Sequence, residues 1–189
     1  EYRLYDIRMG TALIAMPALL RLLYSTGMRI SEALSIRNKH VHLDEGYIRL
    51  YKTKNGSERI VPLCESMKTV LASYMEYRNN MPIKDIAAGN VFLFVKSDGT
   101  NIKANSVYQH LRKLLDTCGI PHKGNHHGPR VHDLRHTNAV HALVQMGHKG
   151  MDLYASLPIL STCLGHHSLK ATEQYVRLTC NMYPELEEQ

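Results

Sequence analysis

The sequence predicts a mainly α-helical fold with a small three-stranded antiparallel β-sheet, which is an α+β class. Three observations lead to it: most apolar residues recur at helical spacing, two β-type runs flank an Asn-Gly pair, and a third apolar run ends in Ser-Asp-Gly. A length of 189 residues gives one domain, and 44% hydrophobic residues suffice for a core. No apolar run approaches the roughly 18–20 residues that a membrane-spanning helix needs.

The first element is helical. Residues 9–24 are apolar at helical spacing, and Pro17 predicts a kink or a break between two helices. Gly27 suits the end of this helix, and Ser31 is predicted to cap a short helix over 32–36.

Three β-type runs follow or interrupt the helices. Residues 47–51 and 59–63 flank Asn55-Gly56, a strong hairpin signal, and Pro62 suits the end of a strand. Residues 91–95 (VFLFV) are predicted to be the third strand. Helical periodicity predicts the remaining elements at 65–77, 103–118 with Gly119 as its stop, 132–146, 156–164, and one or two short helices after Gly165.

The charge distribution favours a polyanionic partner. The formal net charge is +6, and twelve histidines add charge below neutral pH. Residues 29–59 hold seven basic and four acidic side chains, and residues 101–135 hold six and two. Residues 173–189 reverse this balance, with one basic and four acidic side chains. Two basic regions and an acidic tail predict a charged face from which the tail is kept away.

The cysteines indicate a reducing compartment. Four cysteines in 189 residues show no paired spacing, so they fit neither a metal knuckle nor a disulfide framework: Cys64, Cys118, Cys163 and Cys180. No secretory signal opens the chain. We therefore expect a cytoplasmic protein.

Three local patterns carry chemically useful residues. His132 and Arg135, in His-Asp-Leu-Arg at a helix start, share one helical face and can converge on one anion. Leu-Gly-His-His-Ser contains His166, and Tyr175 follows nine residues later. Arg29 directly follows a tight turn in Thr-Gly-Met-Arg-Ile-Ser-Glu. Each pattern alone is weak.

Taken together and in this order, the patterns resemble the catalytic domain of the tyrosine recombinases, or phage integrase family, over about residues 11–180. TGMRISE is similar to the box of the first catalytic arginine, and KNGSERIVPL to the hairpin of the catalytic lysine. HDLRHT is similar to the His-x-x-Arg box, LGHHS to the second-histidine box, and Tyr175 takes the place of the nucleophile. The resemblance implies the family's catalytic-domain fold.

The resemblance also implies a mechanism without metal or ATP. In-line cleavage places negative charge on the phosphate oxygens, which Arg29 and Arg135 would neutralise in place of metal ions. Tyr175 would form a 3′-phosphotyrosyl intermediate that stores the phosphodiester energy. Lys54 would protonate the leaving 5′ oxygen. The remaining two implied catalytic residues are His132, which would assist proton transfer with the tyrosine, and His166, which would hydrogen-bond the phosphate. We expect no cofactor, and no acidic cluster of the kind that holds Mg²⁺ is visible.

Several assignments have alternatives. Lys52 competes with Lys54, although the alignment through residues 58–63 selects Lys54. Arg29 could merely cap a helix or pair with Glu32, and a late-helix tyrosine is often only a packing residue. His167 adjoins His166. Two further sets of side chains either bind a ligand or are only solvated surface. The first set lacks the spacing of zinc ligands: His122, His126 and His127. The second set would hold DNA phosphates: Arg37, Lys39, Lys103, Arg112, Lys113 and Arg130.

The expected partner is double-stranded DNA at specific recombination sites. The resemblance implies a homotetramer on DNA, and we expect a monomer in isolation. The tail 176–189 would be exchanged in trans, or else fold back on its own domain. We expect residues 1–189 to be a single catalytic domain without the family's N-terminal core-binding domain, and DNA affinity to be weak. The hypotheses are an integrase of a phage or mobile element, a chromosome-dimer-resolving recombinase, and a catalytically inactive DNA-binding relative.

Overall fold

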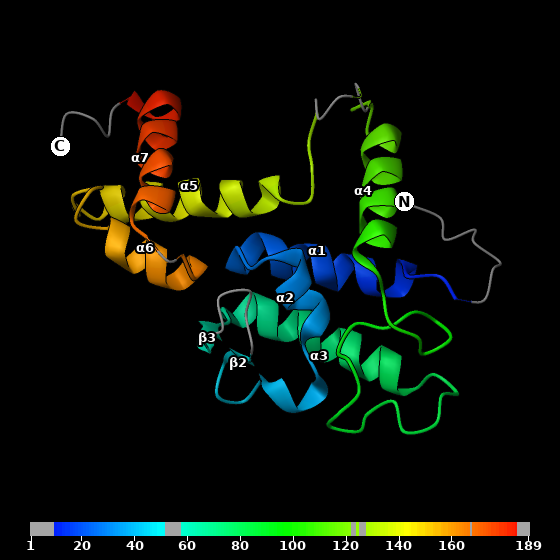
Figure 1. The fold of residues 1–189 in the computed structure, drawn as a ribbon. Coiled ribbons are helices and arrows are strands. Elements are labelled where there is room, and N and C mark those ends of the chain that lie inside the picture. The colour runs from blue at the N-terminus through cyan, green and yellow to red at the C-terminus, as the bar shows by residue number, and fades with distance from the viewer. Residues whose placement is uncertain (1–9, 52–57, 122–123, 125–127, 167, 185–189) are drawn as a thin grey trace.

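The computed structural model describes residues 10–51, 58–121, 124, 128–166 and 168–184. It confirms the predicted class, because helices dominate and the sheet is small, three-stranded and antiparallel (Figure 1). The elements in chain order are η1 (Leu13–Ala15), α1 (Met16–Thr26), α2 (Ile30–Ser35), η2 (Asn38–His40), β1 (Val41–His42), β2 (Tyr47–Leu50), β3 (Arg59–Pro62), α3 (Glu65–Asn79), α4 (Ala104–Thr117), α5 (Asp133–His148), α6 (Leu157–Leu164) and α7 (Lys170–Met182).

The buried apolar side chains form two clusters. The first runs from Ala12 to Val131 and joins α1, α2, the sheet, α3 and α4. The second runs from Ala139 to Val176 and joins α5, α6 and α7. Helix α1 contacts both α3 and α5, so it connects the two clusters, and the three late helices lie together on one side of the molecule (Figure 1). None of the helices in the described ranges has both the length and the apolar character needed to cross a bilayer.

The first helical region is divided as the sequence predicts. Pro17 stands in the first turn of α1, where its missing N–H costs no hydrogen bond, and η1 precedes it as a separate short helix. Gly27 ends α1 in the left-handed conformation at φ 61°. The Ser31 cap is wrong, because α2 begins at Ile30, two residues before the predicted start, and Arg29 occupies the N-cap position. The Glu32 carboxylate accepts the Arg29 backbone N–H at 2.8 Å and supplies the capping interaction.

Two of the three predicted strands are confirmed. Strands β2 and β3 pair antiparallel, with Ile48 opposite Val61, and both side chains are buried. The third strand is not residues 91–95 but β1, which pairs with β2 through Val41 and Ile48. The sheet order is therefore β1-β2-β3, in sequence order.

Leu93, Phe94 and Val95 are buried, and partners outside the segment bind its backbone groups. The Leu93 N–H donates to the Ile36 carbonyl at 2.8 Å, and the Leu93 carbonyl accepts from both Tyr74 Oη (3.1 Å) and Arg78 Nη1 (2.8 Å). Val95 N–H donates to Tyr74 Oη at 3.4 Å. Because these groups are already satisfied, the segment makes only isolated bridges and no strand.

Helices α3 to α6 begin and end within a few residues of their predicted bounds, and Gly119 follows α4 at φ 75°. After Gly165 the described residues form a single helix, α7, of 13 residues, which is longer than the one or two short helices predicted there. Within the tail, α7 continues to Met182. Val176 is 2% exposed and belongs to the second cluster of its own chain, whereas Leu178 and Met182 are exposed. Residues 185–189 lie outside the described ranges, so tail exchange stays a prediction.

Candidate active site

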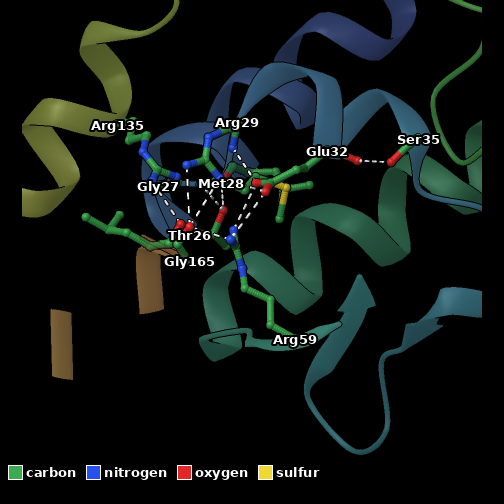
Figure 2. A network of polar contacts seen from close by, with 11 residues as sticks. Thr26, Gly27, Met28, Arg29, Glu32, Ser35, Arg59, Arg135 and Gly165 are labelled. Carbon is green, nitrogen blue, oxygen red and sulfur yellow. Dashed lines mark hydrogen bonds and ion pairs between the residues drawn. The ribbon is translucent and has the colours of Figure 1, made fainter. Parts of the chain in front are cut away.

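Three arginines from distant segments converge beside Glu32 and the end of α6 (Figure 2). Arg29 precedes α2, Arg59 begins β3, and Arg135 lies in the first turn of α5. The Glu32 carboxylate is 4% exposed and pairs with Arg29 Nη1 at 3.1 Å and with Arg59 Nη2 at 2.9 Å. Three guanidinium groups and one carboxylate give these four side chains a net charge of +2, which suits an anionic ligand.

Carbonyl oxygens at the end of α6 hold the arginines in place. The Leu164 carbonyl accepts from Arg135 Nη2 at 2.8 Å and from Arg59 Nη1 at 2.9 Å. The Gly165 carbonyl accepts from both Nη atoms of Arg29 at 3.4 Å. The C-terminal carbonyls of a helix carry its partial negative charge, so α6 positions the cations without adding a carboxylate.

Arg135 is the most enclosed of the three cations. It is 3% exposed, and its Nη1 donates to the Gly27 carbonyl at 2.7 Å. Burial, reinforced by the charge of Arg29, lowers the pKa of Arg135 to about 10. The guanidinium therefore remains charged at neutral pH.

Gly165 permits this close packing. It follows α6 in the left-handed conformation, at φ 65°, and a Cβ at this position would overlap the Arg59 guanidinium. The Leu-Gly-His sequence therefore has a local physical reason: the glycine lets β3 approach the end of α6.

His166 follows this glycine and lies against Tyr175. Their rings are parallel to within 6°, with centroids 6.2 Å apart, and His166 Nδ1 hydrogen-bonds Thr172 Oγ1 at 2.7 Å. Burial lowers the pKa of His166 to about 4, and Arg135 and Arg29 contribute in the same direction. His166 is therefore a neutral hydrogen-bonding group near pH 7.

Tyr175 is buried in α7, with 1% exposure, and its hydroxyl hydrogen-bonds His136 Nδ1 at 2.9 Å. Burial raises the pKa of the Tyr175 phenol, while the charges of Arg135 and Arg29 oppose this rise. The phenol is consequently protonated at neutral pH and needs a proton acceptor before it can act as a nucleophile.

His132 stands at the N-cap position of α5, one turn before His136. The two rings meet edge to face, with centroids 4.8 Å apart. Partial burial lowers the pKa of His132, and the neighbouring His136 and Arg135 lower it further.

The structure thus brings five of the six predicted site residues together: Arg29, His132, Arg135, His166 and Tyr175. The sixth, Lys54, lies outside the described residues, as do its competitor Lys52 and His122, His126, His127 and His167. The alternative that Arg29 caps a helix and pairs with Glu32 is also observed. Both roles are compatible, because Arg29 also reaches the Gly165 carbonyl. No metal-binding group of three or more His, Cys, Asp or Glu is found within the described part of the chain.

Sequence reasoning missed two residues at this site. His136 is four residues after His132 and therefore on the same helical face, a signal that was available in His-Asp-Leu-Arg-His. Arg59 had no comparable signal, because only the folded hairpin brings it to Glu32, 27 residues away in sequence.

Comparison with known proteins shows the family to which the chain belongs. The model of the phage integrase family matches residues 4–182. The chain belongs to the phage integrase family, whose members are tyrosine recombinases.

Individual relatives agree with this assignment. Tyrosine recombinase XerD of Oceanobacillus iheyensis is 32% identical over 178 residues, covering 94% of this chain and 55% of that protein. Tyrosine recombinase XerC of Thermodesulfovibrio yellowstonii is 32% identical over 162 residues, covering 85% and 49%. The chain therefore spans about half the length of these relatives.

Solved structures share the fold. XerA recombinase superposes with a TM-score of 0.67 at 22% identity, covering 96% of this chain and 66% of XerA. XerH site-specific recombinase, in a pre-cleavage complex with its difH substrate, gives a TM-score of 0.66 at 26% identity, covering 90% and 45%.

Proposed function

We propose that residues 1–189 are the catalytic domain of a site-specific recombinase that cuts and rejoins double-stranded DNA through a covalent 3′-phosphotyrosyl intermediate. The observation that carries this proposal is the meeting of Tyr175 with Arg135 and Arg29, from three separate elements. Burial raises the pKa of the phenol, and the charges of Arg135 and Arg29 both oppose this rise, so the tyrosine and the two cations lie close enough to share one anion site.

In this mechanism the Tyr175 oxygen attacks a backbone phosphorus in line with the 5′ oxygen. Negative charge develops on the two non-bridging oxygens, and Arg29 and Arg135 neutralise it. Arg135 is suited to this role because its carbonyl partners fix the guanidinium before any phosphate arrives. The phosphotyrosyl ester conserves the bond energy, so a 5′ hydroxyl of a second strand can displace Tyr175 without ATP.

Lys54 protonates the departing 5′ oxygen, as the family resemblance implies. The hairpin that carries it is joined to the arginine site through Arg59, at the start of β3. His166, neutral at pH 7, hydrogen-bonds the scissile phosphate.

DNA cleavage also requires a local opening. Tyr175 is 1% exposed in the isolated chain, so a phosphate needs a local displacement of the residues around the hydroxyl to reach it. We propose that DNA binding and assembly supply it. In this view the chain is a monomer alone and a homotetramer on DNA, where the tail after Tyr175 packs on a neighbouring subunit.

The cellular role is proposed at a coarser level. The family model and the Xer relatives are compatible with an integrase of a mobile element or phage and with a chromosome-dimer-resolving recombinase. The genes that flank the reading frame would separate these two roles.

The test is covalent capture. The protein, expressed from its own complete reading frame, is incubated with a library of nicked duplexes of randomised sequence and then denatured. We expect DNA covalently attached to the protein by its 3′ phosphate, peptide mapping of the linkage to Tyr175, and a free 5′ hydroxyl on the released strand. Failure to capture DNA, or linkage through another residue, would refute the proposal.

A further inference from the structure

The hydrogen bond between Tyr175 and His136 connects α7 to α5 at the reactive oxygen. The phenolic oxygen and His136 Nδ1 are 2.9 Å apart, and the ring centroids are 5.6 Å apart with a tilt of 48°. Tyr175 is 1% exposed, so this contact is shielded from bulk water.

The other two histidines of the site are placed differently. His166 lies flat against the Tyr175 ring, and its Nδ1 is occupied by Thr172. His132 meets the edge of the His136 ring. Among the described contacts, a nitrogen of His136 is therefore the histidine nitrogen that reaches the phenolic oxygen.

We propose that His136 is a catalytic residue that accepts the phenolic proton of Tyr175 during DNA cleavage. This inference rests on the proposed function above and deepens it, because it assigns the proton acceptor for the nucleophile to His136 instead of His132.

The O–H bond of Tyr175 breaks and the proton moves to His136 Nδ1, while the phenolic oxygen forms its bond to phosphorus. The bond from phosphorus to the 5′ oxygen breaks, and that oxygen takes a proton from the general acid. On rejoining, the incoming 5′ hydroxyl returns its proton to the deprotonated general acid as its oxygen bonds to phosphorus. The bond from phosphorus to the Tyr175 oxygen breaks, and the proton on His136 returns to that oxygen.

The surroundings of His136 suit a proton acceptor. Burial, together with the cations Arg130 and Arg135, lowers the pKa of His136 below 6.5, whereas Asp133 acts in the opposite direction. His132 on the same helix and Tyr175 from α7 are the other titratable groups that face it. His136 is therefore neutral at pH 7, so Nδ1 can accept the proton with Nε2 carrying the ring N–H.

The experiment compares H136Q and H136A with wild type on nicked duplexes obtained by the covalent capture, each made with a normal or a 5′-phosphorothiolate leaving group. A thiolate departs without protonation but does not replace the proton acceptor of the tyrosine. We expect both variants to form adducts about 10²-fold more slowly on both substrates, with DNA binding unchanged. K54A should instead be rescued by the phosphorothiolate.

A matched control lies on the same helix. His141 Nδ1 also hydrogen-bonds a tyrosine hydroxyl, that of Tyr24, at 3.1 Å, with the rings edge to face. H141Q removes an equivalent histidine–tyrosine contact outside the site, so its adduct rate should equal that of wild type.

Two readouts separate proton transfer from a structural role. Added imidazole should partly restore H136A, whose truncated side chain leaves room for it, and should not restore H136Q. The wild-type rate should fall as the pH drops through the lowered pKa of His136, where the ring becomes protonated, and H136Q should lose part of that dependence. If H136Q fails to fold, the imidazole rescue of H136A decides whether His136 accepts the proton.

Three outcomes would overturn the inference. Adduct formation by both variants at the wild-type rate would remove His136 from the reaction. Faster adduct formation by H136A would show that His136 restrains Tyr175. Slowing without imidazole rescue or any change in pH dependence would reduce His136 to a packing residue. Absence of adduct from the wild type itself would instead refute the proposed function, and the inference with it.

Discussion

Arg59 of β3 and Glu32 of α2 form a buried ion pair, with Nη2 and Oε2 2.9 Å apart and side-chain exposures of 11% and 4%. The pair joins the β-hairpin to the helix that Arg29 begins, and the same carboxylate also binds Arg29. Glu32 therefore holds two cations at fixed positions next to the end of α6.

Glu32→Gln should destabilise the fold, because two enclosed guanidinium groups lose their carboxylate. Breaking a buried pair costs about 3–5 kcal/mol, so we expect the free energy of unfolding to fall by about 3 kcal/mol in urea denaturation. Glu58→Gln is the control, since the Arg49–Glu58 pair is about half exposed on both sides. Its effect should stay below about 1 kcal/mol. Equal effects of the two substitutions would contradict a special role for Glu32.

Gly165→Ala should impair the site through two separable effects. A left-handed conformation costs alanine about 1–2 kcal/mol, and the new methyl group displaces the Arg59 guanidinium. Gly150→Ala and Gly119→Ala suffer the first effect alone, because both have positive φ and nothing within 4 Å of the added Cβ. We expect Gly165→Ala to lose more unfolding free energy than either control, and to lose covalent adduct formation as well. Matching losses in all three would limit the role of Gly165 to its backbone.

Lys54→Ala tests the predicted general acid, which lies outside the described residues. Cleavage of normal DNA should slow about 10²-fold, whereas a 5′-phosphorothiolate substrate should be cleaved at nearly the wild-type rate. Lys52→Ala, two residues away, is the matched control and should leave both rates near wild type. Equal slowing of both substrates by Lys54→Ala would indicate phosphate binding only, and rescue of Lys52→Ala would transfer the role to Lys52.

His166 makes the stability depend on pH. Its pKa is about 4 in the fold against 6.5 ordinarily, so between these values the unfolded chain binds more protons than the folded chain. Stability should therefore fall as the pH is lowered from 6.5 towards 4. Denaturation of His166→Gln across this range should show a shallower decline, with the remainder due to His132 and His136, whose pKa values are also lowered. An unchanged slope would contradict the burial of a neutral His166.

The helices and the hairpin could be predicted because their signals are local. Helical apolar spacing, Asn55-Gly56 and the stop at Gly27 each act within a few residues. The segment 91–95 could not be assigned correctly, because its apolar composition suits any buried extended chain. No strand forms there because Tyr74 and Arg78, both in helix α3, hydrogen-bond the Leu93 carbonyl.

The candidate site shows the same difference between local signals and tertiary contacts. Ordered motifs predicted the residues that the fold brings together, but not the contacts between them. Arg59 and His136 enter the site through tertiary packing, of β3 on the end of α6 and of α7 on α5. Those approaches depend on the whole core. No local pattern specifies Arg59, and the four-residue spacing of His136 from His132 indicates only a shared helical face.

Tyr175 is the proposed nucleophile, and the most direct test of this assignment compares Tyr175→Phe with wild type in covalent capture of nicked DNA. The substitution removes one oxygen and leaves Arg29, Arg59 and Arg135 in place, so DNA binding should persist. Tyr183→Phe, just beyond the same helix, is the control and should form adduct like the wild type. Complete loss of adduct is expected in Tyr175→Phe alone. Adduct formed by Tyr175→Phe at the wild-type rate would contradict the assignment of Tyr175 as the nucleophile.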